Sequence, residues 1–285
     1  MHILPLESSI IYGPLYSRRL DRSLGLNILP TEYKLCSFDC VYCHYGRTQV
    51  KTLAPEGHDF PSVPRVLKAI QKALGRYPNV PYLTFSGNGE PTLHPHFPEI
   101  VDGIRCLRPS LAPDLKLAIF SNATTVMQPD LRAPLQHFAA PILKLDAGDP
   151  ETFAAVNRPA PAVELSDIIA GMQEIPNLII QSVLIDSEDG EVSNIHPAAL
   201  EAWIEALVTL QPTRVQIYST DYPVPDAGVE RVPPYKLQQI AEQVQERTGL
   251  TVTPLLAVKN SFVARRATHP NCPIPGFCYN GSYAH

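Results

Sequence analysis

Three cysteines that lie close together are the residues best suited to chemistry in this chain. Cys36, Cys40 and Cys43 have the spacing C-x3-C-x2-C, directly after an apolar segment. Three thiolates on one short loop can surround a single metal centre. A structural zinc site needs four nitrogen or sulfur ligands, and His44 is a cramped fourth ligand because it adjoins Cys43. Cysteine thiolates also hold iron–sulfur clusters, and three of them would leave one iron of a four-iron cluster open to a small molecule. Incidental cysteines or a zinc knuckle are the alternatives.

A glycine-rich segment, FSGNGEPTLHP, follows the next apolar strand at residues 85–95. Glycine at a strand end lets the backbone approach a ligand closely. Free carbonyls there can accept hydrogen bonds from a ligand ammonium group, and Glu90 can add negative charge. The segment is equally typical of a Gly/Pro-rich turn. The candidate ligand-binding residues in it are Gly87, Asn88, Gly89 and Glu90.

Polar residues also end two later strands. Ser121 and Asn122 follow a buried strand and should face the ligand, or else cap the next helix. Lys144 and Asp146 alternate with leucines, so they share one face of their strand. Because buried charges are rarely unpaired, we expect either an ion pair near a substrate or a purely structural pair. Arg158, beside Asn157 on a predicted loop, could contact a substrate carboxylate or phosphate, or could simply be solvated.

Two further sets of residues have less specific patterns. Arg18, Arg19 and Arg22 lie beside tyrosines and could bind phosphate or RNA, or pair with acidic residues such as Asp39. Three cysteines lie outside the loop and are expected to be buried or incidental thiols: Cys106, Cys272 and Cys278.

The elements that must position these residues alternate between strand and helix about six times. Short apolar strands alternating with amphipathic helices predict a parallel sheet with right-handed crossovers. Ligands then bind at the carboxyl ends of the strands, whether the sheet closes into a barrel or stays open. The expected strands are residues 23–29, 82–87, 115–122, 142–148, 178–185, 215–219 and possibly 250–256. The expected helices are residues 63–74, 97–107, 129–138, 165–172, 200–208 and 237–244.

Composition limits the function classes. The chain has 285 residues, 45% of them hydrophobic, which suits a soluble globular protein. Its net charge of −5 gives no broad footprint for nucleic acid. We find no signal peptide and no apolar run long enough to span a membrane, so we expect a cytosolic protein. In that reducing compartment, clustered thiols are more often metal ligands than disulfides.

The cysteine loop, with Tyr42 as the aromatic residue before the last cysteine, resembles that of the radical S-adenosylmethionine (SAM) superfamily. The stretch Asn88-Gly89-Glu90-Pro91 is similar to the Gly-Gly-Glu-Pro motif that holds the SAM amino group in that family. Asn88 replaces the first glycine, and asparagine tolerates unusual backbone angles. The resemblance implies that a 4Fe–4S cluster cleaves SAM to methionine and a 5′-deoxyadenosyl radical, which removes a substrate hydrogen atom.

An ordered set of motifs over residues 12–220 further resembles bacterial radical SAM proteins related to the wyosine-synthesis enzymes, which modify tRNA. Two features differ from the archaeal wyosine enzymes. No cysteine precedes Cys36, so the second cluster of those enzymes has no ligands here, and the chain is acidic rather than basic. Wyosine formation itself is therefore not expected. A radical reaction on RNA, a peptide or a small molecule stays open.

The resulting prediction is an α/β protein with a partial (β/α)6 barrel in one domain, residues 1–285. It comprises a lead-in at 1–21, a core at about 22–255 and a C-terminal extension at 256–285 that covers the barrel mouth. An external reductant such as flavodoxin or ferredoxin is implied as a partner. The alternative is a non-enzymatic iron–sulfur or zinc sensor. The predicted metal ligands are Cys36, Cys40 and Cys43; the SAM site is Tyr42, Gly87, Asn88, Gly89, Glu90, Ser121 and Asn122; the substrate-side candidates are Lys144, Asp146 and Arg158.

Overall fold

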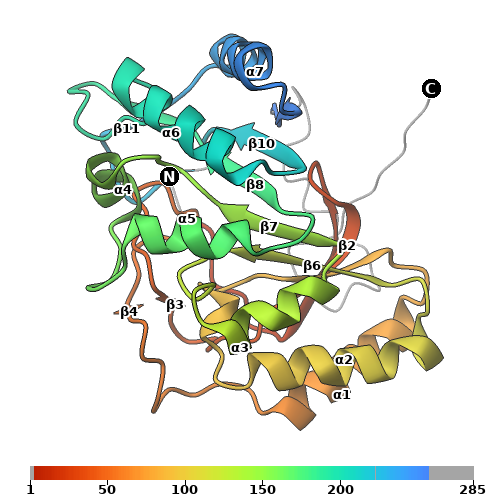
Figure 1. Ribbon diagram of the computed structural model, residues 1–285. Helices are drawn as coiled ribbons and strands as arrows, with labels where there is room; N and C mark the ends of the chain where they lie inside the picture. Colours follow the sequence, from red (N-terminus) through yellow and green to blue (C-terminus); the bar gives the residue numbers. More distant parts are fainter. Residues whose placement is uncertain (1–2, 222, 257–285) are drawn as a thin grey trace, which may run out of the picture.

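A computed structural model describes residues 3–221 and 223–256, which fold around an eight-stranded sheet (Figure 1). Its strand order is β1-β2-β5-β6-β7-β8-β10-β12. From β2 to β12 every neighbouring pair is parallel, and only β1 runs antiparallel to its neighbour. The expected α/β fold with a parallel sheet is therefore confirmed. The strands are β1 (Ile11–Ser17), β2 (Asp21–Leu26), β5 (Tyr82–Phe85), β6 (Lys116–Ser121), β7 (Ala140–Lys144), β8 (Ile179–Val183), β10 (Arg214–Tyr218) and β12 (Val252–Pro254).

Helices cover the outer face of this sheet, as in a partial barrel (Figure 1). Six of the seven α-helices in the described ranges carry proline in the first turn, where its missing N–H costs nothing. Many of the chain's 30 prolines therefore mark helix starts. The α-helices are α1 (Val63–Arg76), α2 (Phe97–Leu111), α3 (Pro129–Arg132), α4 (Pro150–Asn157), α5 (Leu165–Gln173), α6 (Pro197–Leu210) and α7 (Pro234–Thr248), with 3-10 turns at Pro91–Leu93 and Ala133–His137.

Strand alternation separates two kinds of environment. In β6, Leu117 and Ile119 belong to the large core between sheet and helices, whereas Ala118 packs in a smaller cluster on the inner face. Leu20, from the turn after β1, joins that inner cluster. In β7 the same alternation sends Lys144 to the inner face, because it lies two residues after Ile142.

Three elements differ from the sequence prediction. The single helix expected at residues 129–138 is instead α3 followed by the 3-10 turn Ala133–His137. The lead-in contains strand β1, which forms a hairpin with β2. Residues 150–157 form α4 rather than a loop, so Asn157 ends a helix and Arg158 caps it. Asp149 followed by Pro150 is a helix-start signal that could have revealed this helix: the Asp149 side chain accepts a hydrogen bond from the Thr152 amide.

Short strands complete the described fold, and their few residues leave no periodic pattern in the sequence. They are β3 (Leu35–Cys36) with β4 (Val50–Lys51), and β9 (Ile185–Ser187) with β11 (Val229–Arg231). No helix in the described part of the chain is both long and apolar enough to cross a membrane. The predicted mouth-covering extension, with Cys272 and Cys278, lies outside the described residues apart from residue 256.

Candidate active site

The cysteine loop lies directly against the glycine-rich segment that follows β5. The Leu35 amide donates to the Asn88 carbonyl at 3.0 Å, and the Glu90 amide donates to the Leu35 carbonyl at 3.2 Å. Gly89 lies between them with φ +140°, and a Cβ placed there would be 1.7 Å from the Leu35 carbonyl oxygen. Only glycine permits this crossing, since any side chain would collide with backbone. The glycine therefore fixes the position of the first cysteine's strand.

The other flank of the cysteine loop is held by the end of α4. The Val41 amide donates to the Val156 carbonyl, and the Asp39 amide donates to the Asn157 carbonyl, both at 3.1 Å. The stretch Asn157–Pro159 thus docks the cysteine loop through its backbone. The sequence analysis placed this stretch on a substrate-facing loop.

A buried lysine lies among the three cysteines. Lys34 is 3% exposed, and its ammonium group donates to the Gly46 carbonyl at 2.8 Å. Burial acts to lower the pKa of Lys34, but its attraction to Cys43, Cys36 and Cys40 raises that pKa above the ordinary value. The three thiols are therefore near enough to act together on one cation. Sequence analysis missed Lys34, although a basic residue two positions before a cysteine was a visible signal.

Two amide groups donate to cysteine sulfurs. Asn122 Nδ2 lies 3.6 Å from Cys36 Sγ, and Asn157 Nδ2 lies 3.4 Å from Cys40 Sγ. Burial raises the pKa of Cys36 to about 12 and that of Cys40 to about 11. Both thiols are therefore protonated near neutral pH unless a metal centre displaces the protons. Amide N–H groups that donate to the sulfurs suit thiolates bound to iron. Such hydrogen bonds adjust the reduction potential of an iron–sulfur cluster.

The three cysteine sulfurs suit an iron–sulfur cluster better than a single metal ion. Across residues 3–221 and 223–256, no three His, Cys, Asp or Glu side chains form a group that could hold one metal ion. A cluster differs from a single ion in that its thiolates bind several irons. Three soft sulfur donors with amide hydrogen bonds are the ligand chemistry of an iron–sulfur cluster. The residues present fit that group.

Glu90 joins the ends of β5 and β6. It is 1% exposed, and its carboxylate accepts hydrogen bonds from Ser121 Oγ at 2.8 Å and the Asn122 amide at 2.6 Å. The Thr92 amide and hydroxyl donate to the same carboxylate. Burial raises the pKa of Glu90, although these donors oppose the rise. The structure therefore brings Glu90, Ser121 and Asn122 together as predicted, but bonded to one another.

Asn88, which stands where the resembling motif has glycine, points away from this group. Its side chain bonds the Glu7 backbone and donates to the Pro30 carbonyl at 2.9 Å. Its backbone does not adopt a positive φ, so the tolerance expected of asparagine is not used. Gly87 does need its freedom: φ is +117°, and a Cβ would lie 2.5 Å from Asn27 Oδ1. Asn88 thus ties the N-terminal segment to the strand ends.

A second group of polar side chains centres on Asp146. Its carboxylate accepts hydrogen bonds from the Tyr42 hydroxyl, from Asn157 Nδ2 at 2.8 Å and from the Val183 amide at 2.7 Å. Lys144 Nζ lies 2.9 Å from Asp146 Oδ1, so the predicted ion pair is present. Burial, followed by the charge of Asp146, raises the pKa of Tyr42 well above its ordinary value. Tyr42 is therefore a neutral donor that joins the cysteine loop to Asp146.

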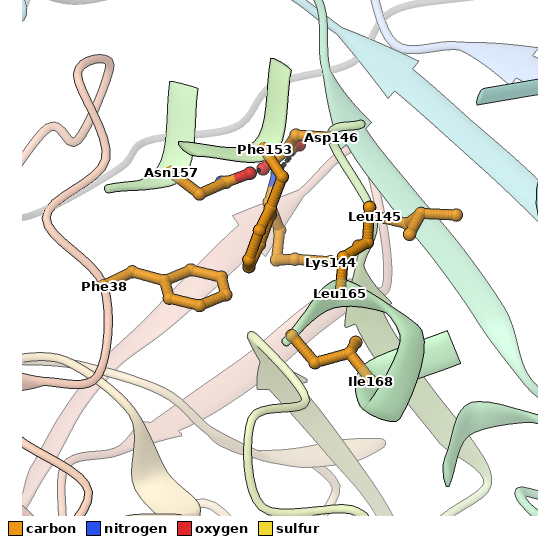
Figure 2. A pocket seen from close by; sticks show the side chains of 8 residues that line it. All are labelled: Phe38, Lys144, Leu145, Asp146, Phe153, Asn157, Leu165 and Ile168. Atoms are coloured by element: carbon orange, nitrogen blue, oxygen red, sulfur yellow. Dashed lines mark hydrogen bonds and ion pairs between the residues drawn. The ribbon is translucent and has the colours of Figure 1, made fainter. Parts of the chain in front are cut away.

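A small pocket opens beside this second group, with the Phe38 and Phe153 rings facing it (Figure 2). The polar ends of Lys144, Asp146 and Asn157 gather on one side of it (Figure 2). The pocket lining is Phe38, Lys144, Leu145, Asp146, Phe153, Asn157, Leu165 and Ile168.

The structure does not bring Arg158 to the Lys144–Asp146 pair. Arg158 has a left-handed backbone at φ +46°, and its guanidinium pairs with Asp226 at 2.8 Å. Arg47 shares the same Asp226 carboxylate at 3.2 Å. The substrate-contact prediction for Arg158 thus gains no support from its position.

The three N-terminal arginines each have a different partner and form no common patch. Arg18 pairs with Asp221 at 2.5 Å rather than with Asp39, and Arg22 donates to the Asn79 carbonyl. Arg19 instead lies over the Tyr218 ring, 4.6 Å from its centroid. All three arginines are therefore engaged with the protein itself.

The sequence of this chain is similar to those of known proteins over the segments that carry these polar groups. The sequence profile of the radical SAM superfamily matches residues 33–186, just over half of the chain. The UPF0026 protein MJ1312 of Methanocaldococcus jannaschii is 36% identical over 166 residues, which cover 58% of this chain and 49% of that protein. This chain thus matches about half the length of that relative.

Two solved structures share the fold at 13% sequence identity. Streptococcus suis SuiB bound to S-adenosylmethionine superposes with a TM-score of 0.58, covering 81% of this chain and 50% of that one. TYW1 with a lysine-pyruvate adduct bound superposes with a TM-score of 0.55, covering 79% and 74%. The matched profile begins before the cysteine loop and ends beyond the strand that bears the Lys144–Asp146 pair, so this chain belongs to the radical SAM superfamily of enzymes, which use S-adenosylmethionine and an iron–sulfur cluster.

Proposed function

We propose that Cys36, Cys40 and Cys43 hold a 4Fe–4S cluster and that the chain cleaves SAM reductively to begin radical chemistry on a substrate. When bound, the cluster supplies one electron that splits SAM into methionine and a 5′-deoxyadenosyl radical, which removes a substrate hydrogen atom. The observation that carries the proposal is the docking of the cysteine loop on Gly89, because that contact holds the strand of Cys36 against the partly exposed segment that follows β5.

The backbone after β5 supports a place for the SAM amino group. The Gly87 carbonyl accepts from the Gly89 amide at 2.9 Å, and the Asn88 carbonyl accepts from Leu35 at 3.0 Å. Within the described chain the Gly89 carbonyl accepts no such backbone bond, and Gly89 is partly exposed. A ligand ammonium group near the cysteines would find this carbonyl available.

Glu90, Ser121 and Asn122 then act as a frame for the SAM site. Their mutual hydrogen bonds keep the ends of β5 and β6 at a fixed spacing, and Asn122 extends that frame to Cys36. A rigid frame holds cofactor and cluster in reacting geometry without reorganisation. Tyr42 extends the frame from the cysteine loop to the end of β7, since its hydroxyl donates to Asp146.

The electron must come from outside the chain, so a small reductant such as flavodoxin or ferredoxin is part of the proposal. The substrate is not identified. RNA is one candidate, and retention of tRNA on the purified protein that is lost with added salt would support it. The engagement of Arg18 and Arg22 with protein partners does not favour an RNA-binding arginine patch.

The direct test is product analysis. The protein is reconstituted anaerobically with iron and sulfide, reduced with dithionite and mixed with SAM. Liquid chromatography with mass spectrometry then quantifies 5′-deoxyadenosine. The native protein should form it, and Cys40→Ala should not. Cys106→Ala is the matched control, because this exposed thiol lies away from the loop. A spectroscopically intact cluster that neither binds SAM nor forms product would contradict the proposal.

A further inference from the structure

The side chain of Lys34 joins the two ends of the cysteine loop. Its ammonium group reaches across the loop and donates to the Gly46 carbonyl at 2.8 Å. The Gly46 amide in turn donates to the Cys43 carbonyl at 2.9 Å, so this acceptor belongs to the turn that follows the last cysteine. Lys34 itself lies two residues before Cys36. The ammonium group is therefore held by the same loop that carries the three proposed cluster ligands.

The backbone of Lys34 is fixed as well. Its amide donates to Gln49 Oε1 at 2.8 Å, and its carbonyl accepts from the Val50 amide at 3.1 Å. These bonds adjoin the short β3–β4 pair that contains Cys36. A lysine on the surface normally keeps its ammonium group in water. Lys34, bonded through its backbone and its side chain, has its charge in one place and away from solvent.

No carboxylate forms an ion pair with Lys34 in the part of the chain that the structure describes. The charged groups that attract it are the cysteines, Cys43 most strongly, then Cys36 and Cys40. Lys34 is only 3% exposed, and a lysine so deeply buried is rarely without a partner. An uncompensated buried charge is also costly. The three sulfurs are therefore the counter-charge that suits this lysine.

The charge of Lys34 bears on how easily the proposed cluster takes up an electron. Three thiolates bring negative charge to the site, and one added electron makes that charge more negative. A buried cation beside these sulfurs favours the reduced state, because attraction between charges is weakly screened in a low-dielectric interior. Net charge is one of the factors that set the potential of an iron–sulfur cluster. Lys34 is thus placed to make reduction easier.

A second lysine of the same loop provides an internal comparison. Lys51 lies opposite Cys36 in the β3–β4 pair, but its side chain is exposed and its ammonium group donates to the Arg158 carbonyl at 3.3 Å. Water and salt screen an exposed charge, so Lys51 should contribute little to the potential at the sulfurs. Burial therefore distinguishes Lys34 from a lysine that is equally close to Cys36 in the fold.

Resting on the proposed radical SAM function, we propose that Lys34 is a positioning residue whose buried charge raises the reduction potential of the cluster held by Cys36, Cys40 and Cys43. The role requires no contact with SAM or substrate, since Lys34 acts through the sulfurs. The electron itself comes from the external reductant, so the step needs no further reactant. A higher potential allows a weaker reductant to supply that electron.

The test is an anaerobic redox titration of the reconstituted full-length protein, with the reduced cluster measured by electron paramagnetic resonance. Lys34→Met keeps a long apolar side chain and removes the charge. It should lower the equilibrium constant for one-electron reduction about tenfold or more, which is a shift of about 59 mV to more negative potential. Lys34→Gln should shift the potential in the same direction, although it keeps a hydrogen-bond donor. Lys51→Met is the matched control and should change the constant less than about twofold.

Lys34→Gln is also the second variant should Lys34→Met not fold. A native potential in either folded variant would overturn the proposal, because a purely structural contact with Gly46 changes stability and not the potential. A shift as large in Lys51→Met would overturn it too, since burial would then have no effect. Loss of iron from both folded Lys34 variants, with full iron in Lys51→Met, would support Lys34 as the counter-charge of the cluster.

Formation of 5′-deoxyadenosine by the native protein is measured alongside. A native protein that assembles no cluster would contradict the proposed function itself. A native protein that forms the product, and whose potential is unchanged in Lys34→Met, would contradict only this inference.

Discussion

The two halves of the barrel mouth are built in different ways. At the ends of β5 and β6, the cysteine loop is held by backbone hydrogen bonds across Gly89. At the ends of β7 and β10, the interior is shaped by side chains, with Lys144 and Asp146 beside Tyr218. Backbone contacts fix geometry and tolerate few replacements, whereas a side-chain surface can change with one substitution. The first half suits an invariant cofactor, and the second suits a substrate particular to this chain.

The largest expected effect comes from breaking the backbone-held half. Gly89→Ala places a Cβ 1.7 Å from the Leu35 carbonyl oxygen, so the cysteine loop must move. We expect a loss of about 3 kcal/mol or more in the free energy of unfolding, together with poor retention of iron. Urea denaturation and iron analysis measure the two effects.

Gly57→Ala is the matched control for that substitution. Gly57 has a positive φ of +80°, but a Cβ there meets nothing within 4 Å. It should cost only the conformational strain of about 1–2 kcal/mol and leave iron binding intact. Equal losses in both variants would show that the backbone crossing at Gly89 has no special role.

A smaller effect is expected where the two halves meet, at Asn157. Asn157→Ala removes the donor to Cys40 Sγ and to Asp146, which we expect to cost about 1–3 kcal/mol of stability. The cluster potential should also become more negative, because an N–H donor to sulfur stabilises the reduced state. Redox titration followed by electron paramagnetic resonance (EPR) measures this shift.

Asn157→Asp sharpens the same test. A second carboxylate beside Asp146 should repel it, so this variant should be less stable than Asn157→Ala at neutral pH. The difference should shrink on acidification, as one carboxylate of the pair takes up a proton. An unchanged potential in both variants would mean that Asn157 only docks the loop.

The smallest effect is expected at Arg158, outside both halves. Burial acts to raise the pKa of Asp226, but hydrogen bonds from Arg158, Arg47 and a backbone amide hold it below its ordinary value of 3.8. The stabilisation is therefore present above pH 3.8 and is lost as the pH falls through the lower folded value. Arg158→Gln should cost under about 1 kcal/mol at pH 7 and leave SAM cleavage unchanged.

Thermal unfolding at several pH values, alongside the 5′-deoxyadenosine assay, checks this prediction. The stability difference between Arg158→Gln and the native protein should narrow below pH 3.8. A loss of SAM cleavage or of substrate turnover in this variant would return Arg158 to the substrate side, where the sequence analysis placed it.

The same contrast explains how much the sequence could predict. The parallel sheet, its outer helices and the cysteine loop follow from periodicity and spacing, which are local. Gly89 was singled out because glycine at a strand end permits close approach to a ligand, whereas the structure shows that it also permits the close approach of the Leu35 backbone, which no local pattern predicted. Helix α4 was missed although Asp149 and Pro150 mark its start, because the eight-residue helix carries no clear apolar stripe.

The side-chain half could not be predicted in this way. The meeting of Arg19 with Lys144 depends on how the β1–β2 hairpin sits against the sheet, and no local pattern encodes that. Asn88 had a motif position but not the expected role, since its partners Glu7 and Pro30 are distant in sequence. The ion pair between Arg158 and Asp226 could not be predicted either, because the two residues lie on segments remote in sequence.

The measurement that tests the central claim most directly is EPR of the reconstituted, dithionite-reduced protein before and after addition of SAM. If Cys36, Cys40 and Cys43 hold a four-iron cluster with one open iron, SAM should bind that iron and shift the signal. Cys40→Ala should lose the signal altogether. An intact reduced-cluster signal that saturating SAM leaves unchanged would contradict the account.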